Sequence, residues 1–157
     1  MDFMFGHSLD DITVSIQLAI APIFLLVGTG SLLNVVTARL GRIIDRARAL
    51  ENAIEAGEEA QLEKRHVMEL SVLDRRMSYG NRAVLFCTLS AVLICLMVSV
   101  LFLLDLFGIP AGLIVILLFV SAVVALSIGL LSFLIEVTIA TNVLRVRTEL
   151  LSRRTKI

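Results

Sequence analysis

The sequence begins its first apolar stretch at Ile12 and continues it to Val36 as ITVSIQLAIAPIFLLVGTGSLLNVV, with no charged side chain. Two more uncharged stretches follow, Ala83–Leu104 and Leu106–Ile135. Each exceeds the roughly 20 apolar residues that a helix needs to cross about 30 Å of hydrocarbon. A chain of 157 residues has too few polar residues to cover three such helices in a soluble core. The sequence therefore predicts an all-α integral membrane protein with transmembrane spans at residues 12–36, 83–104 and 111–135.

Composition and motifs exclude several functional classes. Hydrophobic residues make up 58% of the chain, and its mean hydropathy is +0.96. The 14 basic and 14 acidic residues balance, which argues against a basic nucleic-acid-binding protein. The chain carries no phosphate-binding glycine loop, dinucleotide fingerprint or nucleophile elbow. His7 and His66 fall on opposite sides of the predicted membrane, and Cys87 and Cys95 are too far apart on one span for a disulfide bond. We therefore expect no enzyme activity, no cofactor and no metal site.

The basic residues predict the orientation in the membrane. None of the 14 lies in residues 1–38 or in the link between the second and third spans. All of them fall within residues 39–82 and 145–157, which lie on the same side of a three-span chain. Cytoplasmic segments are enriched in Lys and Arg. We therefore expect a multi-pass protein of the bacterial inner (plasma) membrane, with its N-terminus outside and its C-terminus in the cytoplasm.

The cytoplasmic segment 37–82 has a helical pattern of its own. Its first half, together with Val36 just before it, carries apolar residues at alternating spacings of four and three. This spacing is typical of a coiled-coil seam. The apolar residues are Val36, Leu40, Ile43, Ala47, Leu50 and Ile54. Glu58 and Glu59 suit the first turn of a second helix, because acidic side chains favour a helix N-terminus. The pattern predicts a coiled-coil-like hairpin with its tip near residues 56–59. Two helices lying on the membrane surface are the alternative. With a cytoplasmic helix or tail over 136–157, residues 1–157 would form a single membrane domain.

Several short motifs resemble those of a known family. They are AIAP at 19–22, LNVVTAR at 33–39, RIIDRAR at 42–48, LDRR at 73–76, NRA at 81–83 and EVTIAT at 136–141. Together they resemble a bacterial family of small membrane proteins catalogued as domain of unknown function 2721. The resemblance covers nearly the whole chain, and the arginine-rich stretch after the first span is its most specific part. It implies a three-span membrane protein and supplies no activity, substrate or catalytic residue.

The second span carries a stripe of small residues that recurs every four positions. It consists of Ala83, Cys87, Ala91, Cys95 and Ser99. In lipid, helices associate through small side chains that let their backbones approach closely. Shorter stripes occur on the other two spans, so the chain has more such surfaces than one small bundle needs. We expect the stripe of the second span to face another copy of the chain in a homo-oligomer. Packing within one chain is the alternative.

Polar residues gather where the spans meet the cytoplasm. Counted along the helices, Glu136 and Arg82 lie at similar depth, and Asn34 and Arg39 bracket that level on the first span. An acid at such a boundary prefers a cationic partner to lipid. We therefore expect Glu136 to pair with Arg82 or Arg39, and a solvated Glu136 is the alternative. The next arginines on the first helix suit anionic lipid headgroups. They are Arg42, Arg46 and Arg48.

These features favour a non-enzymatic membrane protein of structural type. We expect a homo-oligomeric scaffold, regulatory or accessory subunit whose cytoplasmic hairpin binds a protein partner. The alternative is a homo-oligomeric ion channel or pore, cation-preferring because its outer side carries acidic and no basic residues. The span interiors hold no charged residue, which favours the scaffold over the channel.

Overall fold

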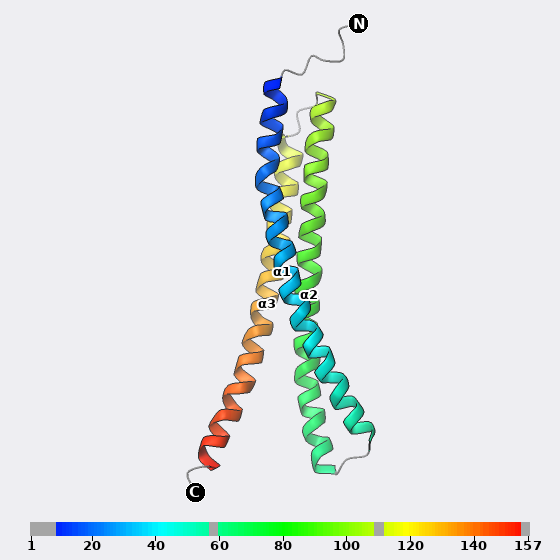
Figure 1. Ribbon diagram of the computed structural model, residues 1–157, viewed down its shortest axis with the longest axis vertical. Helices are drawn as coiled ribbons and strands as arrows, with labels where there is room; N and C mark the ends of the chain where they lie inside the picture. The colour runs from blue at the N-terminus through cyan, green and yellow to red at the C-terminus, as the bar shows by residue number, and fades with distance from the viewer. Residues whose placement is uncertain (1–8, 57–59, 109–111, 155–157) are drawn as a thin grey trace. The chain divides into compact units, whose positions relative to one another are not determined.

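Three long α-helices make up the computed structural model, which describes residues 9–56, 60–108 and 112–154 (Figure 1). They are α1 (Leu9–Glu55), α2 (Ala60–Leu106) and α3 (Gly112–Arg154). The all-α prediction is confirmed. Each apolar stretch continues into polar sequence without a break, so the helix expected after residue 136 is the end of α3. Of the predicted hairpin tip, only Ala56 lies within the described residues.

All three helices are long and apolar enough to cross a membrane. In the most apolar part of each helix, only 17–22% of the residues are buried within the chain. Large side chains such as Phe24, Leu103 and Leu131 are 73%, 54% and 60% exposed. Water does not favour so extensive an apolar surface, whereas the hydrocarbon of a bilayer covers it. The architecture is therefore compatible with a multi-pass membrane protein.

By its internal contacts the chain divides into two units, and all three helices contribute to both. The first unit comprises Met1–Leu33 and Phe86–Ser127. Its buried residues are mostly small, and they include Ala19, Thr29, Cys87, Ser90, Ala122 and Ala125. The Ser90 hydroxyl donates a 2.8 Å hydrogen bond to the carbonyl of Ala122, which links α2 to α3. Small side chains allow the close backbone approach that stabilises helix pairs in lipid.

The second unit comprises Asn34–Leu85 and Ile128–Ile157. Its apolar core joins the end of α1 to the start of α2, which lie side by side in Figure 1. The core consists of Ile43, Ala47, Leu50 and Leu73, with Leu70 and Met77 packed against it. The two helices approach closely at Gly80, where an added Cβ would lie 3.0 Å from Cδ1 of Leu40. The seam positions of α1 are therefore used for packing within the chain.

Buried positions recur every seven residues along each helix. On α1 they are Pro22, Thr29, Val36, Ile43 and Leu50. On α2 they are Leu73, Gly80, Cys87 and Ile94, and on α3 they are Ala122, Gly129 and Glu136. This spacing is typical of helices that pack side by side along their length. It also places one acidic residue, Glu136, on the buried face of α3.

Candidate functional site

The charged core of the second unit centres on Glu136. This residue is 1% exposed, because it continues the buried face of α3 seven residues after Gly129. Arg76 of α2 donates from Nε and Nη2 to Oε1 of Glu136, at 3.1 and 2.8 Å. Nη2 of Arg39, on α1, lies 3.5 Å from Oε2 of the same carboxylate. One carboxylate therefore joins three helices, and we call this set the Arg39–Glu136–Arg76 cluster.

The two arginines contribute unequally to this cluster. Arg76 makes two hydrogen bonds to one oxygen, whereas Oε2 of Glu136 is buried with no hydrogen bond from any described residue. Arg39 also places its guanidinium 5.5 Å from the ring centroid of Phe133, a cation–π distance. Removing a carboxylate from water costs several kcal/mol, and good hydrogen-bond geometry offsets this cost. Arg76 is therefore the main partner of Glu136, and Arg39 is the weaker one.

The predicted polar network is confirmed in part. Glu136 pairs with Arg39, as expected, and it is not solvated. The pairing with Arg82 is wrong, because Arg82 is exposed and its guanidinium lies 5.7 Å from the ring centroid of Tyr79. Asn34 is also exposed, and its backbone carbonyl accepts a hydrogen bond from Thr37.

Sequence reasoning missed Arg76 as the main partner of Glu136. The signal that would have found it is its place on the helix, seven residues before the fully buried Ala83. Counting residues along the helices compares only the depth of side chains in the membrane, and by depth Arg82 was the expected partner. Arg82 lies on a different face of α2 from Arg76. For a buried charge, the face of the helix decides the partner.

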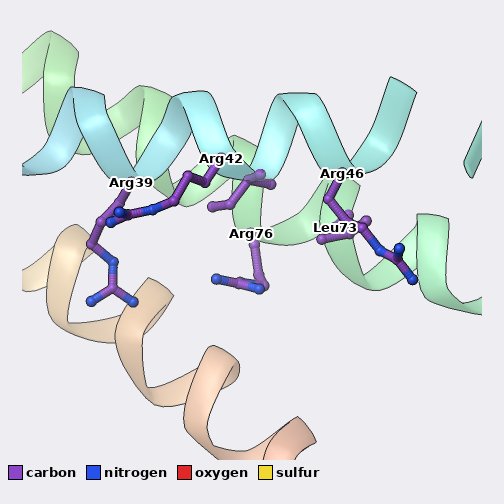
Figure 2. A pocket seen from close by; sticks show the side chains of 6 residues that line it. Arg39, Arg42, Arg46, Leu73 and Arg76 are labelled. Carbon is purple, nitrogen blue, oxygen red and sulfur yellow. The ribbon is translucent and has the colours of Figure 1, made fainter. Parts of the chain in front are cut away.

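A pocket of about 210 Å³ lies beside the cluster in the second unit. Figure 2 shows Arg39, Arg42 and Arg46 along α1, with Arg76 extending from α2. The three arginines of α1 share one face, because residues three and four apart are neighbours on a helix. Arg46 is held by Glu69 of α2, which accepts hydrogen bonds from its Nε and Nη2 at 3.0 and 2.8 Å. We call this site the arginine pocket.

The arginine pocket contains two of the three residues predicted to contact lipid headgroups. All three side chains are exposed, and Arg42 and Arg46 line the pocket whereas Arg48 does not. Guanidinium groups offer N–H donors and no acceptor, so the chemistry that this lining offers is anion binding. Among the described residues, no group of three or more His, Cys, Asp or Glu side chains could hold a metal ion.

The predicted stripe of α2 does not follow one face of the helix. Ala83 and Cys87 are 0% exposed, Ala91 is half-buried, and Cys95 and Ser99 are exposed. A step of four residues advances about 40° more than a full turn, so the stripe turns by about 160° over its length. The prediction that Ala83 and Cys87 face another copy is wrong, because contacts within the chain already cover them. For Ala91, Cys95 and Ser99 it stays a prediction.

The fold and the cluster define the class of protein. It is an all-α protein with three helices able to cross a membrane, joined in the second unit by one buried carboxylate and two arginines. The chain belongs to the family described as "Protein of unknown function (DUF2721)", which it matches over residues 19–146. The family resemblance read from the sequence motifs is thereby confirmed, and the matched region includes the cluster and the arginine pocket. No curated protein and no solved structure matches the chain.

Proposed function

We propose that the protein is a small, non-enzymatic integral membrane protein that acts as a homo-oligomeric scaffold, regulatory or accessory subunit. Its three spans lie in the bacterial inner membrane, with the N-terminus outside and the C-terminus in the cytoplasm. Residues 37–82 project as a cytoplasmic helical hairpin, and this hairpin binds a protein partner. Arginines near the inner boundary contact anionic lipid headgroups.

Two apolar side chains that are exposed outside the predicted spans carry this proposal. Val67 and Met68 of α2 are 52% and 70% exposed, although Lys64, Arg65 and Glu69 surround them in the sequence. They precede the second apolar stretch, which begins at Ala83, by roughly 22 Å of helix. On a projecting hairpin, lipid does not reach them. Met is enriched at protein–protein interfaces, so we infer that a protein partner covers Val67 and Met68.

The packing of the second unit supports a partner-binding role. The seam of α1 is already filled by Leu70, Leu73 and Met77 of α2, so the partner does not need to complete it. The Arg39–Glu136–Arg76 cluster fixes the base of the helix pair to α3. A pair held in this way presents Val67 and Met68 with little conformational entropy left to lose on binding.

Photo-crosslinking in cells tests the partner surface. A benzophenone amino acid in place of Met68 should yield an adduct of defined mass with a protein, and Met68→Asp should prevent co-purification of that protein. The same benzophenone residue in place of the exposed Asp74, which lies about 120° around α2 from Met68, should give little of this adduct. Adducts with lipid alone at position 68 would contradict the proposal and favour helices lying on the membrane.

Thiol labelling and mass measurement test the topology and the assembly. In a chain without other cysteines, an impermeant reagent applied from outside should label His7→Cys and spare Gly57→Cys; both positions lie outside the described residues. The reverse pattern would refute the orientation. Native mass spectrometry of the purified chain should show a homo-oligomer, and a monomer in mild detergents and nanodiscs would refute self-association.

A further inference from the structure

The arginine pocket holds more positive charge than the acids around it neutralise. Four guanidinium groups line it, and two carboxylates contact them. Glu136 is shared by Arg39 and Arg76, and Glu69 holds Arg46. The side chain of Arg42 forms no ion pair with any residue that the structure describes. Among the described residues, the four guanidinium groups therefore outnumber the carboxylates in contact with them by two.

The residues that line the pocket suit a tetrahedral oxyanion. Guanidinium groups present planar pairs of N–H donors that match the oxygens of a phosphate. The remaining lining consists of Ile43 and Leu73, so the donors lie against an apolar wall. An apolar wall strengthens charge–charge attraction by displacing water. A volume of about 210 Å³ leaves room for an anion of several atoms beside the arginines.

We propose that the arginine pocket is a binding site for a phosphate ester. Arg42 supplies the uncommitted donor, and Arg39, whose contact with Glu136 is the longer one at 3.5 Å, supplies the second. Arg46 and Arg76 add positive charge while they stay hydrogen-bonded to their own carboxylates.

The position of the pocket identifies the headgroup of an anionic phospholipid as the favoured source of the phosphate. Arg39 follows the first apolar stretch, which ends at Val36, by roughly 4–5 Å of helix. This is the level of the headgroup phosphates if α1 crosses the bilayer there. The lipid source deepens the proposed function and rests on its membrane topology. The phosphate site itself does not depend on that topology, because a soluble phosphate ester offers the same chemistry.

Ligand titration of the full chain tests the site. The purified protein, in a non-ionic detergent, is titrated with short-chain phosphatidylglycerol, with glycerol 3-phosphate and with a carboxylate-headed amphiphile of equal chain length. Native mass spectrometry counts the bound molecules. The wild type should bind phosphatidylglycerol saturably and the carboxylate amphiphile more weakly. Arg42→Gln should weaken phosphate binding about tenfold, the value of one charge-assisted hydrogen bond.

The matched control is Arg48→Gln, which removes an equal charge from the exposed surface of the same helix and should change the affinity by less than about twofold. Since Arg42 has no ion-pair partner among the described residues, its replacement should leave the circular dichroism spectrum unchanged. Stronger binding of phosphatidylglycerol than of glycerol 3-phosphate supports the lipid source, and equal binding supports a phosphate ester from solution. Equal losses in Arg42→Gln and Arg48→Gln, or equal binding of the carboxylate amphiphile, would overturn the site. Met68→Asp, which tests the partner surface, should leave phosphate binding intact, so the two proposals fail separately.

Discussion

Two arginine–glutamate pairs of the second unit share one geometry and differ in burial. In each pair, Nε and Nη2 of the arginine donate to a single carboxylate oxygen, and the shorter distance is 2.8 Å. The side chains of Arg46 and Glu69 are 53% and 40% exposed, whereas those of Arg76 and Glu136 are 21% and 2% exposed. The two pairs therefore differ mainly in burial, and in the longer contact that Glu136 also makes with Arg39.

Double-mutant cycles should give very different coupling energies for the two pairs. Exposed ion pairs couple by about 0.2–1 kcal/mol, because water and salt screen them. Groups in one buried network couple by up to about 3 kcal/mol. Arg76 keeps some contact with solvent, so we expect about 2 kcal/mol for Arg76–Glu136 and about 0.5 kcal/mol for Arg46–Glu69. Glu136→Gln alone should cost about 3 kcal/mol, since it leaves two arginines facing an uncharged partner.

Equilibrium unfolding in mixed micelles, followed by far-ultraviolet circular dichroism, measures these energies. The cycles use Arg76→Gln with Glu136→Gln, and Arg46→Gln with Glu69→Gln. Raising the salt concentration to about 1 M, where charges are screened within about 3 Å, should remove the coupling of the exposed pair and leave most of the buried one. Equal couplings in the two cycles, or equal sensitivity to salt, would refute the argument that burial determines the strength of the Glu136 pair.

Three further predictions concern packing. Gly80→Leu should destabilise the chain by about 1–3 kcal/mol through overpacking, whereas Gly41→Leu should be tolerated, because no neighbouring atom lies within 4 Å of an added Cβ; unfolding in mixed micelles compares the two variants. Ser90→Ala should cost about 0.6 kcal/mol in the same assay, the average for an interhelical hydrogen bond in a membrane protein, and no loss would mean that the bond contributes nothing net. A membrane-permeant thiol reagent should modify the exposed Cys95 much faster than the buried Cys87, and an oxidant should cross-link chains only through Cys95; faster modification of Cys87 would contradict its burial.

The apolar sequence predicted the helices and part of their packing. On α1, spacings of four and three repeat every seven residues and so keep to one face, and Val36, Ile43, Ala47 and Leu50 are buried there. The cytoplasmic coiled coil stays a prediction. The small-residue stripe of α2 was misread because a constant spacing of four turns steadily around the helix. The buried positions Cys87 and Ile94 keep the seven-residue interval instead.

The charged site was harder to predict, because it depends on which helix faces meet. Sequence distance placed Glu136 near the end of its span and identified Arg39 as a partner, since both follow directly from counting residues. It could not distinguish Arg76 from Arg82, which are less than two turns apart on α2 but lie on different faces. The pocket needs arginines from two helices, and the spacing within α1 gave no indication that Arg76 would join them.

The seven-residue interval has a consequence for how the gene can vary. Each residue inserted into a helix rotates everything beyond it by about 100°. A one-codon deletion between Arg76 and Ala83 would thus turn Cys87, Ser90 and Ile94 away from their neighbours together. Seven inserted codons would restore the phase to within about 20°. Related chains should therefore change length at the connections between helices, or within helices by whole multiples of seven, while single substitutions accumulate on the exposed apolar surface.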